Sequence, residues 1–124
     1  MVKVAAFRSW NFNARDIDAT VRFYQDVLGA DVSMEHTIGG ARVVRMRVGG
    51  VGLGVFDATD GPRPGVPHHT FAVEGPADSR ELVDEIEAKG FKVESVREHR
   101  GGAGYSVYVS DPAGNRVELS VGEG

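Results

Sequence analysis

The sequence predicts an α+β fold in which one domain contains two copies of a βαβββ module. Three observations lead to this prediction. Several short segments alternate polar and apolar residues, and a period of two is typical of strands with one buried face. Two longer segments repeat apolar residues at helical spacing. The same order of elements occurs on either side of a linker at residues 58–67, where three prolines and two glycines exclude a helix or a central strand.

The first module is predicted over residues 1–57. Its first strand is the alternating segment at residues 9–13. Asp16 offers an N-cap for a helix that reaches Leu28, and Gly29 can supply the left-handed residue with which many helices end. The other three strands of this module are predicted at residues 30–36, 41–48 and 51–56.

The second module is predicted over residues 68–124 and repeats this order. Residues 68–73 form its first strand, Pro76 falls in the first turn of its helix, and Gly90 ends that helix. The Asp-Pro-Ala-Gly segment at residues 111–114 is suited to a type I turn. The other three strands of this module are predicted at residues 91–96, 105–110 and 116–121.

Composition excludes several classes of function. The 124 residues carry 14 Lys and Arg against 18 Asp and Glu, a formal net charge of −4, which is not the basic balance of a nucleic-acid-binding protein. The absence of Cys excludes disulfides, thiolate zinc sites and cysteine nucleophiles. No segment is apolar and long enough for a signal-peptide core or a membrane span, so we expect a cytoplasmic protein without a membrane partner.

Two motifs and the strand between them resemble a known family. Residues 23–29 are FYQDVLG, residues 111–119 are DPAGNRVEL, and the strand HHTFAV lies between them at residues 68–73. Over essentially the whole chain this combination resembles the vicinal oxygen chelate superfamily of glyoxalases, bleomycin-resistance proteins and extradiol dioxygenases. The resemblance implies two curved mixed sheets, each with a helix on its outer side, and a homodimer. Because members of the family differ in activity, the fold does not fix the function.

The resemblance also implies four positions from which metal-dependent members bind a divalent ion. In this chain these positions are Ser9, Gly54, His68 and Glu118. A catalytic metal site needs about three protein ligands and an open position, and only His68 and Glu118 offer ligand chemistry. We therefore expect either no cofactor or a weakly bound Zn, Ni, Mn or Fe ion, with Glu118 as the catalytic carboxylate if the chain is an enzyme.

Both of these residues also have ordinary structural interpretations. His68 is as well explained by hydrogen bonds in a pocket or turn, and Glu118 by an ion pair with Arg116 or another arginine. Arg45 and Arg47 share a strand face, where they either contact solvent or meet an anionic group, and contact with solvent is the simpler interpretation.

A binding site without a metal is the other interpretation of the same faces. Polar and small residues share the inner faces of two predicted strands: Ser9, Asn11 and Asn13 on one, and Gly52, Gly54 and Phe56 on the other. Such a surface offers a few directed polar groups beside an aromatic ring, although twist or a bulge explains the glycines equally well. By resemblance, the loop at residues 98–105 borders the pocket, which makes His99, Arg100 and Tyr105 candidate rim residues.

Three hypotheses follow. The first is a metal-independent protein that sequesters a bulky, partly aromatic small molecule, such as an antibiotic, as bleomycin-resistance proteins do. The second is a metal-dependent lyase, isomerase or dioxygenase with a degenerate metal site. The third is a structural or regulatory module in which the concave faces of the curved sheets are filled by the protein's own side chains.

Overall fold

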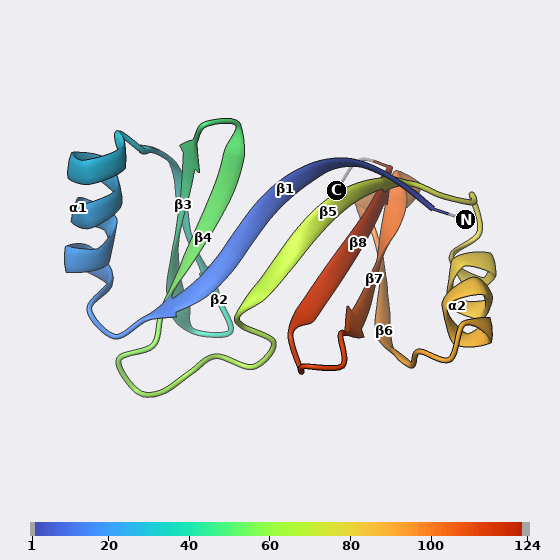
Figure 1. The fold of residues 1–124 in the computed structure, drawn as a ribbon. Helices are drawn as coiled ribbons and strands as arrows, with labels where there is room; N and C mark the ends of the chain where they lie inside the picture. The colour runs from blue at the N-terminus through green and yellow to red at the C-terminus, as the bar shows by residue number, and fades with distance from the viewer. Residues whose placement is uncertain (1, 123–124) are drawn as a thin grey trace. The chain divides into compact units, whose positions relative to one another are not determined.

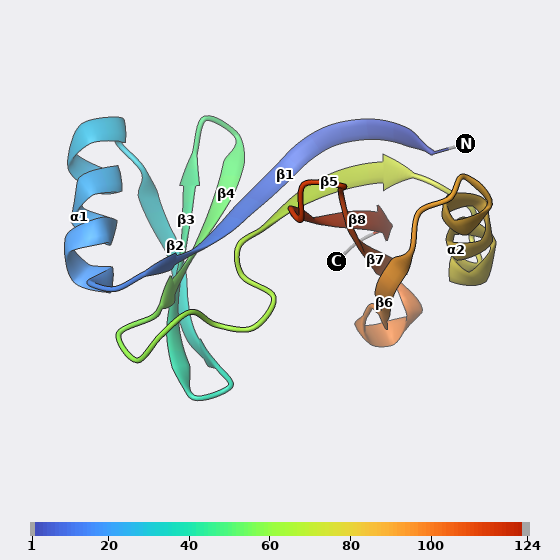
Figure 2. The same cartoon turned by 60° about the horizontal axis from the view of Figure 1, so that its bottom comes forward.

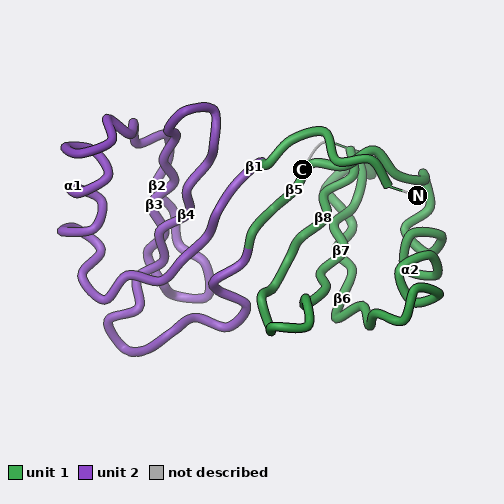
Figure 3. Tube along the Cα trace, in the orientation of Figure 1, with its two compact units in different colours: residues 1–7, 69–124 green, residues 8–68 purple. Residues whose placement is uncertain are grey.

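The computed structural model describes residues 2–122, which divide into two compact units (Figures 1 and 3). Unit 2 comprises residues 8–68, and unit 1 comprises the described residues up to Phe7 together with those from His69 onward. The element order is βαβββ followed by a second βαβββ, so the predicted α+β class and the repeated module are confirmed. Residues 2–7 belong to the unit formed by the second module, because the first strand is longer than the sequence indicates.

Unit 2 contains one helix and the sheet of the first module, in the strand order β2-β3-β4-β1. β1 pairs with β4 in parallel, whereas β2–β3 and β3–β4 are antiparallel. Figures 1 and 2 show α1 alongside the strands of this unit. Its elements are β1 (Lys3–Ala14), α1 (Ile17–Leu28), β2 (Asp31–Ile38), β3 (Ala41–Val48) and β4 (Val51–Asp57).

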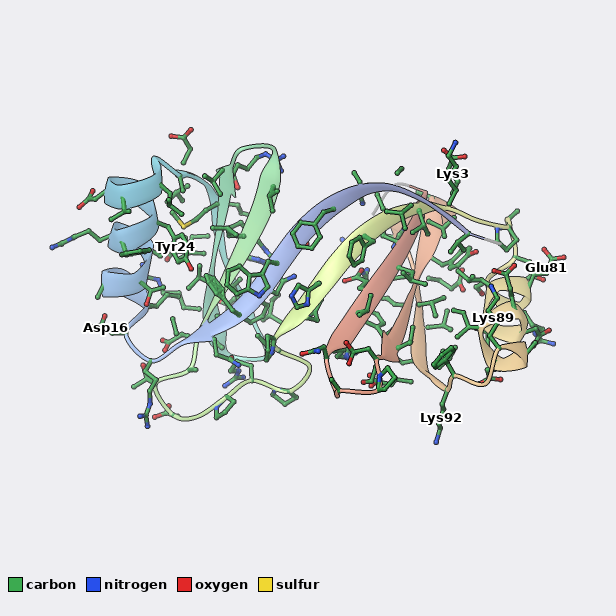
Figure 4. All side chains as sticks on the ribbon, in the orientation of Figure 1. Lys3, Asp16, Tyr24, Glu81, Lys89 and Lys92 are labelled. Atoms are coloured by element: carbon green, nitrogen blue, oxygen red, sulfur yellow. The ribbon has the colours of Figure 1, made fainter. Side chains whose placement is uncertain are left out.

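The core of unit 2 lies between α1 and one face of the sheet. The predicted caps are confirmed: the Asp16 carboxylate accepts a hydrogen bond from the Ala19 amide at 3.1 Å, and Gly29 adopts φ 68°. Figure 4 shows Tyr24 of α1 directed toward the strands. This cluster includes Trp10, Phe12, Ala14, Ile17, Val21, Tyr24, Val44, Met46, Leu53 and Val55. Because side chains alternate along a strand, the odd-numbered residues of β1 and β3 and the even-numbered residues of β4 occupy the opposite face.

Unit 1 contains the elements of the second module and the first residues of β1. Its strand order is β1-β5-β8-β7-β6, and α2 contacts β6 and β7. Buried Leu82 of α2 packs with Tyr105 and Val107 of β7 in the core. The elements are β5 (His68–Glu74), α2 (Ser79–Ala88), β6 (Val93–Glu98), a short 3-10 helix η1 (Arg100–Gly102), β7 (Gly104–Ser110) and β8 (Arg116–Gly122).

The start of α2 corrects one prediction. Pro76 precedes the helix, and Asp78 is its N-cap, with a carboxylate that accepts a hydrogen bond from the Arg80 amide at 2.9 Å. The Pro76 carbonyl instead accepts a hydrogen bond from the Tyr105 hydroxyl at 2.6 Å. The predicted turn before β8 is confirmed, with the Gly114 amide 2.9 Å from the Asp111 carbonyl. Within residues 2–122, neither helix has the length and apolar character needed to cross a bilayer.

Candidate functional site

Three residues form a row across the sheet of unit 2, on the face away from α1. In the strand register, Asn11 of β1 is paired with Gly54 of β4, and Gly54 is paired with Arg45 of β3. The Arg45 side chain extends across the glycine and donates from Nη1 to Asn11 Oδ1 at 2.7 Å. Gly54 is therefore the position at which the two longer side chains meet.

Arg45 is fixed by two further contacts. Its Nε donates to His36 Nε2 at 3.1 Å. Its guanidinium carbon lies 5.6 Å from the centroid of the Phe56 ring, within the range of a cation–π interaction. The charged group is thus held by neighbours on β1, β2 and β4, and the side chain is half-buried.

These contacts also indicate the ring tautomer of His68. Arginine only donates hydrogen bonds, so Asn11 Oδ1 faces Arg45 and Asn11 Nδ2 faces His68 Nε2, 3.1 Å away. His68 Nε2 then accepts, which leaves the ring proton on Nδ1, where it is donated to the Gly65 carbonyl at 3.0 Å. The His68 lone pair that could bind a metal is directed at the Asn11 amide.

The remaining predicted residues of this face have different environments. Asn13 binds the linker: its amide donates to the Val66 carbonyl at 3.1 Å and accepts from the Arg63 amide at 3.0 Å. Ser9 is half-buried beside Gly52 on β4, and Phe56 is buried beneath Arg45. The structure therefore brings Asn11, Gly54, Phe56 and His68 into one cluster around Arg45. We call the side chains of Asn11, His36, Arg45, Phe56 and His68, with Gly54, the Arg45 cluster.

Glu118 is the centre of a second polar cluster, in unit 1. Only 9% of its side chain is exposed. Its carboxylate accepts from Thr70 Oγ1 at 3.0 Å, from Ser106 Oγ at 2.7 Å and from Arg97 Nη2 at 3.4 Å. The hydrogen bond from Arg97 to the Tyr108 hydroxyl, with the nearby Glu118 charge, raises the pKa of Arg97 above its ordinary value. The expected arginine partner of Glu118 is thus Arg97, on β6.

His99 belongs to this cluster, and it is buried rather than placed on a mobile rim. Its Nε2 lies 2.8 Å from Ser106 Oγ. Ser106 gives its only proton to Glu118, so His99 Nε2 must carry a proton and donate it to Ser106. His99 Nδ1 is buried and has no hydrogen-bond partner among the described residues.

The other two predicted rim residues also differ from each other. Tyr105 is 1% exposed in the core beneath α2, so it does not line the polar face of unit 1. Burial raises the pKa of its hydroxyl, and the nearby carboxylates of Asp78 and Glu81 add to this effect. Arg100 is exposed in η1, and it alone of the three fits the expectation of an accessible loop residue.

The residues present do not fit a divalent metal ion. Ser9 is a poor metal ligand and Gly54 has no side chain. His68 Nε2 faces the Asn11 amide, and the oxygens of Glu118 are engaged by three donors. Over residues 2–122, no three side chains of His, Cys, Asp or Glu come close enough together to hold one ion. In addition, the Arg45 guanidinium lies at Gly54, where a second cation would be repelled.

Sequence reasoning did not single out several residues of the two clusters. Glu118 is surrounded by Arg97, Thr70 and Ser106. The alternation of polar and apolar residues along β5, β6 and β7 was the one signal in the sequence that could have placed these three side chains on the same face as Glu118. Arg45 was considered, but a solvent-exposed position was the simpler interpretation. Neighbouring Arg47 does match that interpretation, because it is exposed and donates to the Gly50 carbonyl in the hairpin at 3.2 Å.

Comparisons with known proteins agree with this architecture. A sequence profile of the Glyoxalase/Bleomycin resistance protein/Dioxygenase superfamily matches residues 6–119. The structure resembles methylmalonyl-CoA epimerase from Mycobacterium tuberculosis, with a TM-score of 0.69 and 17% identity over 98% of this chain and 90% of that chain. It also resembles the Streptomyces coelicolor epimerase, with a TM-score of 0.67 and 22% identity over 97% of this chain and 96% of that chain.

A third similar structure comes from another class of enzyme. This is 2,2',3-trihydroxybiphenyl 1,2-dioxygenase from Sphingomonas wittichii, with a TM-score of 0.66 and 23% identity. The match covers 94% of this chain and 42% of the dioxygenase. At such identities the three likenesses establish a shared fold, on which different activities occur.

Proposed function

Because the chain belongs to the Glyoxalase/Bleomycin resistance protein/Dioxygenase superfamily, we propose that it binds a bulky, partly aromatic small molecule, such as an antibiotic, without a metal ion. The observation that carries the proposal is the Arg45 guanidinium lying across Gly54. By resemblance, metal-dependent relatives place an optional ligand at this position, and here it is filled by a fixed positive charge.

The Arg45 cluster has the composition of a small-molecule site. The half-buried Arg45 guanidinium is a directed donor group, and it is held in place by the Asn11 amide and the buried Phe56 ring. A metal-dependent activity has less support, because the two residues with ligand chemistry, His68 and Glu118, are both engaged in hydrogen bonds with protein groups.

A thermal-shift screen tests the binding activity. Chelator-treated protein is expected to melt at a higher temperature with at least one flat aromatic compound, since a ligand at 100 times its Kd stabilises the native state by about 2.7 kcal/mol. The Phe56→Leu variant should bind that compound roughly 2- to 10-fold more weakly, because Arg45 loses the ring against which its guanidinium is held. The matched control Phe91→Leu, at an exposed phenylalanine of unit 1, should bind as the unchanged protein does.

Metal analysis tests the other half of the proposal. After dialysis against Ni²⁺, Zn²⁺, Mn²⁺ or Fe²⁺, the protein should retain less than one ion per chain, and His68→Ala should not alter that amount. One tightly held ion per chain that is lost in His68→Ala would contradict the proposal and favour a metal-dependent lyase, isomerase or dioxygenase. A screen in which compounds bind only after metal is added would do the same.

The proposal includes a homodimer. Phe23, Val27 and Leu28 of α1 are 52%, 62% and 52% exposed, and large apolar side chains gathered on one helix are typical of association sites. Light scattering should give a mass near twice 13.3 kDa. A mass of one chain at every concentration would contradict this part without affecting the binding activity of unit 2.

A further inference from the structure

We propose that Asp60 is a site of spontaneous covalent modification, at which the chain isomerises to isoaspartate through a cyclic imide formed with Gly61. This inference goes beyond the proposed binding function and does not depend on it. Asp60 and Gly61 form the one Asp-Gly pair of the sequence, and they lie in the loop between β4 and β5 (Figure 1). Glycine obstructs the formation of such a ring least, because it has no Cβ atom.

The reaction needs only groups that the chain supplies, together with water. The Gly61 amide nitrogen attacks the side-chain carboxyl carbon of Asp60, and the amide proton and a carboxyl OH group leave as water. Because the two groups belong to neighbouring residues, the step is intramolecular. Water then adds to the five-membered imide and breaks one C–N bond. Breaking the new bond restores aspartate, whereas breaking the original peptide bond gives isoaspartate, in which the main chain passes through the former side chain.

The Asp60 carboxylate is free to approach the next amide. Asp60 is exposed, and within residues 2–122 its carboxylate forms no hydrogen bond or ion pair. Two other loop aspartates are held: Asp57 accepts from the Thr59 hydroxyl at 2.7 Å, and Asp111 accepts from the Asn115 side-chain amide at 2.9 Å. These hydrogen bonds hold the pKa of both carboxyl groups below its ordinary value, which disfavours the protonated form that loses water.

The Gly61 amide is also available for the reaction. A Cβ atom at Gly61 would meet nothing within 4 Å, so the surroundings leave room for the ring. The amide donates to the Ala58 carbonyl at 3.0 Å, and single hydrogen bonds in surface loops open at a small fraction of the free energy of global unfolding. The amides after the other two aspartates differ. Ala58 is 4% exposed and donates to the Ala14 carbonyl at 2.8 Å, and Pro112 has no amide proton.

The loop is held on both sides of the Asp-Gly pair. Before the pair, Thr59 Oγ1 donates to the Arg15 carbonyl at 3.2 Å. After the pair, the Arg63 amide donates to Asn13 Oδ1 at 3.0 Å. Isoaspartate adds one methylene group to the main chain between these two contacts. We therefore expect the modification to displace Arg63 from Asn13 and to shift the amide NMR signal of Arg63.

Ageing the protein in water enriched in a heavy oxygen isotope tests the proposal. After incubation at neutral pH, the protein would be digested in ordinary water and its peptides sequenced by mass spectrometry. One heavy oxygen atom should appear at Asp60, because hydrolysis of the imide takes an oxygen from the solvent. A second form of the same peptide, with isoaspartate at this position, should separate by chromatography. Asp57 and Asp111 are internal controls and should gain no heavy oxygen.

Two variants at this position test the chemistry. Asp60→Glu keeps the charge but would have to form a six-membered imide, so it should gain no heavy oxygen. Asp60→Asn should convert faster and give the same two products, because ammonia leaves in place of water. The proposal is overturned if residue 60 gains no heavy oxygen, if Asp57 or Asp111 gains as much, or if Asp60→Glu ages as the unchanged protein does. An Arg63 signal that stays the same as isoaspartate accumulates would contradict the displacement of the loop.

Discussion

Replacing Glu118 with alanine is expected to lower the free energy of unfolding by roughly 3–5 kcal/mol, as removal of one partner from a buried charged network does. The carboxylate accepts hydrogen bonds from Thr70, Ser106 and Arg97, and the substitution leaves their donors without it. Ser106 is fully buried, so water cannot readily take the place of the carboxylate. Urea denaturation at neutral pH measures this loss.

Two comparisons make this result specific. Glu118→Gln keeps the shape but turns an N–H group toward existing donors, so it should cost about 1–3 kcal/mol. Glu94→Gln is the matched control, because Glu94 bonds to Arg116 and Ser110 at the surface, where an ion pair contributes less than about 1 kcal/mol. Equal stability of Glu118→Ala and Glu94→Gln would contradict the structural role of Glu118. That outcome would favour a reactive or ligand-binding role for the Glu118 carboxylate, since residues with such roles are often retained at a cost to stability.

Local signals in the sequence were sufficient for most of the fold. The Asp16 cap and the Gly29 stop act within one helical turn, so the ends of α1 could be predicted from neighbouring residues. β3 has the predicted bounds, because a glycine pair precedes it and another follows it. Polar and apolar residues do not clearly alternate over residues 3–8, so no comparable signal in the sequence indicated that β1 begins at Lys3.

Contacts between distant residues account for the predictions that were wrong or incomplete. Pro76 and Asp78 both suit the start of a helix, and the choice depends on the Tyr105 hydroxyl, which binds the Pro76 carbonyl from 29 residues away. His99 lies in a glycine-rich segment typical of an exposed loop, yet Ser106 and the cluster around Glu118 draw it into the interior.

The candidate site illustrates the same limit. The sequence placed Asn11, Gly54 and His68 at the site but did not assign the contacts among them. Whether Arg45 or Arg47 contacts Asn11 depends on the register of β1, β3 and β4, and a shift of two residues would exchange the two arginines. This register places Gly54, and not Gly52, beneath the guanidinium.

Replacing Gly104 with alanine is expected to lower the free energy of unfolding by roughly 2–5 kcal/mol, the sum of backbone strain and overpacking. Gly104 has φ 136°, a conformation that side chains other than glycine rarely adopt. A Cβ atom there would overlap the Val121 carbonyl oxygen and lie 3.0 Å from the Gly122 Cα. Both obstacles are backbone atoms of the paired strand β8, so no side-chain rotation relieves them. Urea denaturation measures the effect.

The Gly101→Ala variant separates strain from overlap. Gly101 also has positive φ, at 75°, but a Cβ atom would meet nothing within 4 Å, so its cost should be roughly 1–2 kcal/mol. An equal loss of unfolding free energy in Gly104→Ala and Gly101→Ala would show that the close approach of β7 to β8 adds nothing to the effect of backbone strain. The overlap also has a consequence for the polar cluster, because the Gly104 carbonyl accepts a hydrogen bond from the His99 amide at 2.8 Å. Displacing the start of β7 should therefore loosen His99 and its contact with Ser106, which a change in the ring-proton NMR signals of His99 would report.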